Sequence, residues 1–98
     1  MDKFAILALL HAKPGKEAEV EAFLKSAQPL AVDEEGTTTW YAVKLGPAKF
    51  GIFDTFREEA GRSAHLSGPL AKALMAKADE LLAEPPQIEM LDILASKA

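Results

Sequence analysis

The 98-residue chain contains no cysteine, and this absence removes several kinds of chemistry at once. Disulfides, thiolate zinc sites, iron–sulfur clusters and thiol nucleophiles all require cysteine and are excluded. Glycine is sparse, and Gly46, Gly61 and Gly68 stand apart, so no glycine-rich loop could cradle a phosphate. The serines are not framed by glycines as in a nucleophile elbow, which argues against a serine hydrolase.

The chain also has fewer basic than acidic residues. Eleven lysines and arginines stand against 15 acidic residues, for a formal net charge of −4. The basic residues are scattered and are not interleaved with aromatic residues, so we expect no nucleic-acid partner. The longest apolar run near the N-terminus, residues 4–10, is far too short to span a bilayer. Lys3 before it could imitate a signal peptide, but Asp2 weakens that pattern and favours a buried strand. We therefore expect a cytoplasmic protein with no membrane partner.

The length predicts one domain covering residues 1–98. Apolar periodicity and turn residues predict strands and helices in the order β-α-β-β-α-β. The first helix begins at Glu17 and is expected to end or bend near Ala27–Leu30, because Pro29 cannot donate a backbone hydrogen bond. The second begins at Glu58, is interrupted at Gly68-Pro69 and continues to Glu84. The predicted strands are residues 4–11, 37–45, 49–56 and 88–94.

This order predicts an α+β fold of the ferredoxin-like kind, a four-stranded antiparallel sheet with two helices on one face. The second face should then be polar if it meets water, but residues 4–11 and 88–94 are apolar on both sides. A second copy of the chain is the economical cover, so we expect a homodimer. The alternative is a monomer with an unusually apolar surface.

Four segments carry a family resemblance. They are a Lys-Pro-Gly-Lys turn at 13–16, a Glu-Gly-Thr segment at 35–37, a strand at 49–56 ending in an acid and an aromatic, and an Arg-Ser-Ala-His-Leu segment at 62–66. In this order and spacing the chain resembles the antibiotic biosynthesis monooxygenase (ABM) domain family, whose members are dimeric α+β barrels. The resemblance covers nearly the whole chain.

The resemblance implies a pocket between helices and sheet for aromatic polyketides, quinols or haem. The best-known enzymes of the family oxidise substrates with dioxygen and without flavin or metal, because the substrate anion is the reductant. It therefore implies a cofactor-independent, monooxygenase-like oxidoreductase that binds a small aromatic or quinone-like molecule. Many members are not known to catalyse a reaction. A non-catalytic ligand-binding or stress-associated dimer, and a module that uses the apolar sheet only for assembly, remain alternatives.

His65 is the candidate catalytic residue. An imidazole titrates near neutral pH, so it could take a proton from a phenol or quinol and create the anion that reacts with oxygen. It is also a possible axial ligand for haem. The structural alternative is a helix histidine that hydrogen-bonds a backbone carbonyl near Gly68. His11, at the end of a strand, is more simply a solvated residue.

Trp40 and Asp54 are candidate substrate-binding residues. If the hairpin loop is 46–48, Trp40 faces Asp54 across the ladder, and a loop one residue longer would flip this parity. An indole N–H beside a carboxylate could bind a substrate hydroxyl, or the two groups could satisfy each other. Phe56, on the same face, and Phe23, from the first helix, are the remaining candidates for substrate binding. Three other charged residues are interpreted as solvated charges or dimer contacts: Lys44, Arg62 and Asp92.

No metal or cofactor site is expected. His65 has no second histidine at helical spacing, which argues against zinc. Haem-degrading members of the ABM family rely on a strand asparagine, a tryptophan and a helix histidine. This chain contains no asparagine, and Phe56 stands in the tryptophan's place. We therefore predict that the protein does not degrade haem.

Overall fold

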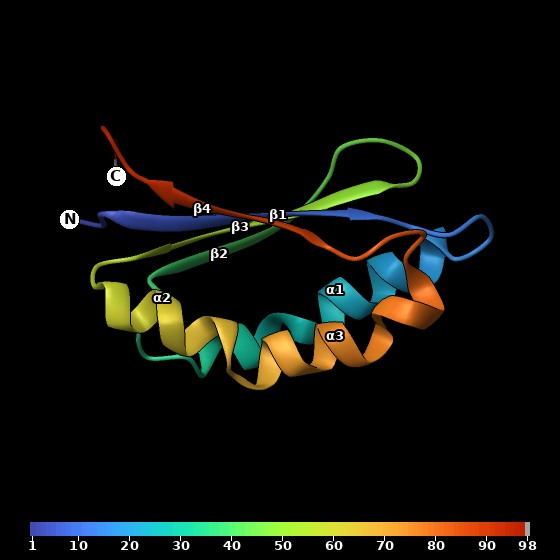
Figure 1. Cartoon of the computed structure of the whole chain (residues 1–98), viewed down its shortest axis with the longest axis horizontal. Coiled ribbons are helices and arrows are strands. Elements are labelled where there is room, and N and C mark those ends of the chain that lie inside the picture. Colours follow the sequence, from blue (N-terminus) through green and yellow to red (C-terminus); the bar gives the residue numbers. More distant parts are fainter. Residues whose placement is uncertain (98) are drawn as a thin grey trace.

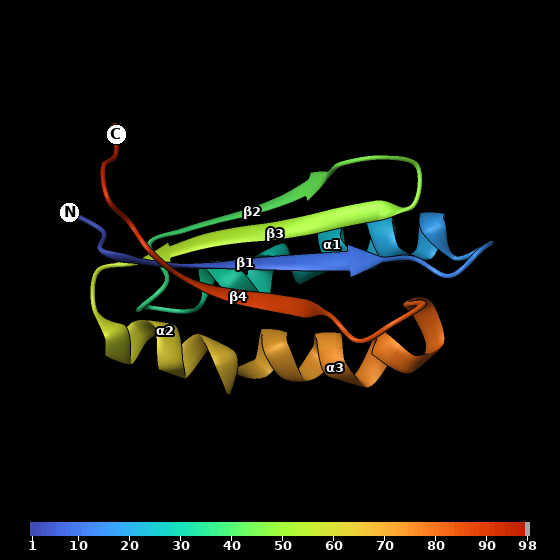
Figure 2. The same cartoon turned by 45° about the horizontal axis from the view of Figure 1, so that its top comes forward.

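The computed structural model describes residues 1–97 and has one four-stranded antiparallel sheet in the order β2-β3-β1-β4. Every helix lies on one face of this sheet, as Figures 1 and 2 show. The predicted ferredoxin-like α+β fold is therefore confirmed. The elements are β1 (Phe4–His11), α1 (Glu17–Val32), β2 (Thr39–Lys44), β3 (Lys49–Phe56), α2 (Glu59–Leu66), α3 (Pro69–Leu81) and β4 (Gln87–Asp92).

The first helix is longer than predicted. α1 continues through Pro29 to Val32, so of the two expected outcomes near Ala27–Leu30, an end or a bend, the end is wrong. Pro29 lies in the last turn, where its missing N–H costs a single bond, and its own carbonyl accepts the N–H of Asp33 at 3.1 Å. The buried side chains of Ala27 and Ala31 hold this last turn against the core.

The second helical stretch divides at Gly68 as predicted, with Pro69 opening α3. The predicted extension of this helix to Glu84 is wrong, because α3 ends at Leu81. The next residues turn toward the sheet, where the N–H of Ala83 donates to the carbonyl of His11 at 2.8 Å. Within residues 1–97, no helix is both long enough and apolar enough to cross a membrane.

The core lies between the helices and the near face of the sheet. Leu10 and Phe50 are fully buried there among aliphatic side chains of α1 and α3, and Phe56 is fully buried against His65 of α2. The opposite face of the sheet carries a strip in which Tyr41, Phe53 and Leu7 are in register across three strands. Tyr41 is exposed and the other two are half-buried. A homodimer that covers this strip remains a prediction.

A contact between two glycines fixes the loop after α1 against α2. A Cβ atom added to Gly36 would lie 2.7 Å from the Cα of Gly61, and one added to Gly61 would lie 2.7 Å from the carbonyl oxygen of Gly36. The two backbones therefore touch, which is possible only where neither residue has a side chain. This approach brings the loop residue Glu34 beside His65 of α2.

Candidate functional site

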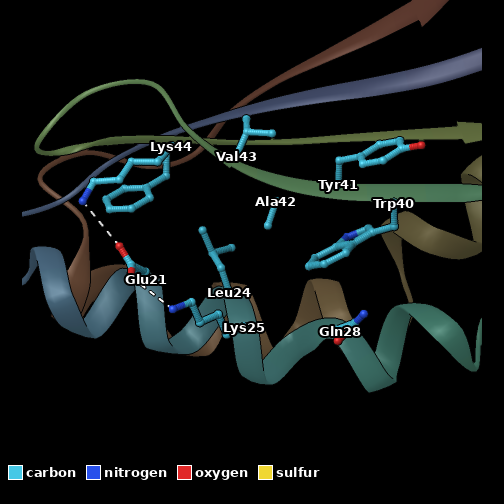
Figure 3. A pocket seen from close by; sticks show the side chains of 10 residues that line it. Glu21, Leu24, Lys25, Gln28, Trp40, Tyr41, Ala42, Val43 and Lys44 are labelled. Atoms are coloured by element: carbon cyan, nitrogen blue, oxygen red, sulfur yellow. Dashed lines mark hydrogen bonds and ion pairs between the residues drawn. The ribbon is translucent and has the colours of Figure 1, made fainter.

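A groove of about 430 Å³ runs between α1 and the edge strand β2 (Figure 3). This volume is within the range of small-molecule sites, roughly 300–1,000 Å³. α1 presents one face to it, because residues 21, 24, 25 and 28 follow the i, i+3, i+4, i+7 spacing of a helix stripe. The small side chain of Ala42 leaves room in the opposite wall. The lining residues are Glu21, Leu24, Lys25, Gln28, Trp40, Tyr41, Ala42, Val43, Lys44 and Phe50.

Trp40 closes one end of the groove. Its indole ring lies between β2 and α1, with Gln28 on the helix across from it (Figure 3). Trp40 and Gln28 also line a second hollow of about 220 Å³ further along the same seam. The two residues therefore separate two neighbouring spaces. The Nε1 atom of Trp40 is buried and has no hydrogen-bond acceptor.

The rim of the groove carries paired charges. Glu21 lies 3.2 Å from Lys25 Nζ and 3.4 Å from Lys44 Nζ. Hydrogen bonds from Lys25 and Lys44 hold the pKa of Glu21 below its ordinary value. Glu21 is therefore an ionised, paired carboxylate at neutral pH and a poor proton acceptor. Lys44, interpreted from the sequence as a solvated charge or a dimer contact, is exposed and also contacts this carboxylate.

Behind the groove, His65 is held between two carboxylates. Its Nδ1 lies 2.5 Å from Glu34 Oε1, and its Nε2 lies 2.9 Å from Asp54 Oδ2. Thr37 donates its hydroxyl to the same Glu34 oxygen at 2.7 Å. The Asp54 contact is close enough for an ion pair but is not aligned as a hydrogen bond, so both oxygens of Asp54 lack an aligned donor. We refer to Glu34, His65 and Asp54 as the buried charge chain.

These contacts decide the protonation state of His65. Burial alone would lower the pKa of this imidazole, but the contacts with Asp54 and Glu34 outweigh burial and raise the pKa to about 9. His65 is therefore a cation at neutral pH, with both ring nitrogens occupied. It could act as a general base or bind haem iron only after one contact breaks. The sequence-based structural alternative, a bond to a backbone carbonyl, is wrong because the ring contacts carboxylates instead.

The structure distributes the predicted site residues over three places. Trp40 lines the groove, and it faces Asp54 in the register predicted from the hairpin loop. Asp54 and Phe56 are completely buried on the adjacent strand and do not line the groove. The Phe56 ring packs against His65, with 5.5 Å between the centroids. Phe23 lies elsewhere, beside a small void between α1 and α3.

The sequence interpretation missed two features of this site. The helix stripe that lines the groove could have been found from its spacing, which includes Gln28. Glu34 lies in a run of acidic loop residues and gave no signal. The interpretation of Arg62 as a solvated charge is also wrong, because its guanidinium is buried, donates to the carbonyl of Leu91 at 3.0 Å and lies over the ring of Phe4. Among residues 1–97, no cluster of three or more His, Cys, Asp or Glu is arranged to hold a metal ion.

Neither the known protein-family models nor the curated protein sequences give a match to the chain. Solved structures do give matches to the chain. A Nitrosomonas europaea protein of unknown function, NE2512, is 55% identical, with a TM-score of 0.97 over 100% of this chain and 95% of its own. Rv0793 from Mycobacterium tuberculosis is 18% identical, with a TM-score of 0.85 over 98% of this chain and 99% of its own. A candidate antibiotic biosynthesis monooxygenase from Caulobacter crescentus is 20% identical, with a TM-score of 0.81 over 96% of this chain and 92% of its own.

Proposed function

Because this chain belongs to the same family as NE2512 and has the ABM-like ferredoxin fold, we propose that it binds a small aromatic or quinone-like molecule in the groove between α1 and β2. The groove itself carries the proposal. Its walls offer the flat ring of Trp40 together with Leu24 and Phe50, which suit a planar apolar ligand.

The rim of the groove specifies what the polar part of the ligand should be. Lys25 and Lys44 offer ammonium donors, and Gln28 offers an amide donor. Glu21 neutralises part of this positive charge. A ligand with one or two carbonyl oxygens at its edge, as in a quinone, would accept hydrogen bonds from these groups. A strongly anionic ligand such as a phosphate ester is less favoured, because Glu21 would repel it.

Oxidation of the bound molecule by dioxygen is the second candidate function. It is supported by the fold, which this chain shares with candidate antibiotic biosynthesis monooxygenases. The groove offers no free base, because Glu21 is paired and His65 is already protonated. The ligand would therefore have to lose its own proton, and the rim lysines would stabilise the resulting anion. Without this reaction, the protein acts as a ligand-binding protein.

Binding can be measured through Trp40, the only tryptophan in the chain. Adding menadione, a small quinone, should quench its fluorescence in a saturable manner. Ala42→Phe should abolish the quenching, because the new ring fills the groove. Ala76→Phe, at an exposed position of α3, is the matched control and should bind as the wild type does. Equal quenching of both variants would refute the groove as the site.

Catalysis needs a separate measurement. Oxygen uptake in the presence of a naphthoquinol should exceed the rate of the protein-free solution if the second candidate function is correct. The Ala42→Phe variant should then fall to the protein-free rate, while Ala76→Phe should keep the wild-type rate. Saturable menadione binding without any added oxygen uptake would leave ligand binding as the function.

A further inference from the structure

The helix α2 lies on the sheet without any buried aliphatic side chain. Of its eight residues, only Arg62 and His65 are buried, and both carry positive charge. Burial of apolar surface is the main force that docks a helix onto a sheet. The other two helices have this force, because each buries four aliphatic side chains: Val20, Leu24, Ala27 and Ala31 in α1, and Leu70, Leu74, Ala78 and Leu81 in α3.

Polar contacts dock α2 instead. His65 lies between Glu34 and Asp54 in the buried charge chain, and Arg62 donates to the carbonyl of Leu91 at 3.0 Å. The attraction between buried charges is largely offset by the free energy needed to take each of them out of water. These contacts therefore fix the position of α2 but hold it less firmly than apolar packing holds α1 and α3.

Unsatisfied polar atoms weaken this docking further. Among residues 1–97, five buried side-chain nitrogen and oxygen atoms have no aligned hydrogen-bond partner. Four of them belong to residues that hold α2 in place: Oε2 of Glu34, both carboxylate oxygens of Asp54, and Nε of Arg62. Each costs free energy while it stays buried. Water would satisfy all four if α2 moved away from the sheet.

We propose that α2 is a lid that opens by itself, while α1, α3 and the sheet keep their folded contacts. Glu58 before the helix and Gly68 after it have extended backbone, so the helix is bounded by a non-helical residue at each end. Opening uncovers the ring of Phe56, which packs against His65. It also uncovers the ring of Phe4, because the guanidinium that lies 4.9 Å from the centre of this ring moves away with α2.

The open lid changes access to the interior of the protein. Asp54 has no exposed surface when α2 is in place, and it lies opposite Trp40 in the ladder between β2 and β3. Trp40 closes one end of the groove. Opening therefore gives water and small solutes a second approach to this end of the groove, from the side of β3. The lid itself does not depend on a ligand in the groove.

Hydrogen exchange of the wild-type protein, followed by NMR for each amide, tests the lid directly. After correction for intrinsic rates, the amides of α2 should exchange on the order of 100-fold faster than the slowest amides of α1 and α3. Their exchange should depend only weakly on urea, whereas α1 and α3 should show the full urea dependence of global unfolding. If α2 shares the rate and the urea dependence of the other helices, it is not a lid.

A thiol under α2 distinguishes opening of the lid from fraying of a short helix. Because the chain has no cysteine, one substitution provides a unique probe. Phe56→Cys places a thiol under α2, and Leu10→Cys places one in the main core, and neither position has any exposed surface. A water-soluble disulfide reagent should label the first variant on the order of 100-fold faster than the second. Equal labelling rates with equal urea dependence would rule out the lid.

Two further substitutions, each added to Phe56→Cys, identify what holds the lid closed. Glu34→Gln weakens a contact that only the closed lid makes, so labelling should become about tenfold faster or more. Val20→Ala weakens the packing of α1, which the open lid keeps, so global unfolding should become easier while labelling keeps its rate. If Val20→Ala accelerates labelling as much as Glu34→Gln does, the thiol reacts only from the unfolded protein, and the proposal is overturned.

Discussion

Raising the pH should destabilise the protein through His65. The ordinary pKa of this side chain is 6.5, and the folded protein raises it to about 9. The folded state therefore holds the proton more tightly than the unfolded state does. This contribution to stability is complete below about pH 6.5, declines as the pH rises, and is lost above about pH 9. The gap between the two pKa values corresponds to about 3 kcal/mol of unfolding free energy.

Urea unfolding at a series of pH values measures this loss. A domain of this size has a total stability on the order of 5–15 kcal/mol, so the expected change is a large share of the whole. The fluorescence of Trp40 and far-ultraviolet circular dichroism should follow the same transition. The midpoint urea concentration should fall steadily between about pH 6.5 and pH 9, while the dependence on urea concentration stays constant.

The other histidine provides the control. His11 is at the end of β1, its side chain is 36% exposed, and it lies 3.6 Å from Glu84. His11→Gln should keep the wild-type pH profile, whereas His65→Gln should lose it. Proton NMR of the His65 ring gives a second readout that does not depend on the stability of a variant. A titration midpoint near 6.5, or a wild-type stability that does not change over this pH range, would refute the charge-chain argument.

Four further outcomes are expected. Sedimentation equilibrium should give about twice the chain mass of 10.5 kDa, and Tyr41→Asp on the open sheet face should give the monomer. A wild-type monomer that does not bind an apolar dye would contradict the dimer. Gly36→Ala should cost about 2 kcal/mol or more in urea unfolding, because the new Cβ would collide with Gly61, while Gly46→Ala, with open space around it, should stay within about 0.5 kcal/mol. If the protein oxidises quinols, His65→Ala should slow steady-state turnover much less than the roughly 10²–10⁴-fold typical of a lost general base, because His65 is already protonated; a loss of that size would show that a proton transfer does pass through this residue. Haemin should give no Soret shift that depends on His65, because both ring nitrogens contact carboxylates; a one-to-one shift abolished by His65→Ala would contradict this.

The strands could be predicted from the sequence because their signals are local. An apolar run predicted β1, and the residues after the turn at 46–48 predicted β3, both with the bounds that the structure has. The loop at residues 46–48 set the register, and the register placed Trp40 opposite Asp54. The end of α1 could not be predicted in the same way. Burial of Ala27 and Ala31 holds the helix together past Pro29, and this packing depends on the tertiary structure.

For the same reason, only part of the candidate site could be predicted from the sequence. Asp54 drew attention because a carboxylate is rare among the apolar residues of a strand. Its partner His65 was singled out, but not the pair of carboxylates that holds it, since Glu34 comes from a loop that only folding brings to α2. The groove depends on the distance between a helix and an edge strand, which no local pattern encodes.

The close contact between the backbones of Gly36 and Gly61 also controls the protonation of His65. Any side chain at either position pushes the loop and α2 apart by roughly the radius of a methyl group. That displacement would separate Glu34 from His65, although neither residue had changed. A relative that keeps both of them but carries a larger residue at position 36 should therefore hold a histidine whose pKa is raised less than in this protein, because Asp54 is then the only carboxylate in contact with the ring. The glycine pair therefore sets how tightly the folded protein holds the proton of His65.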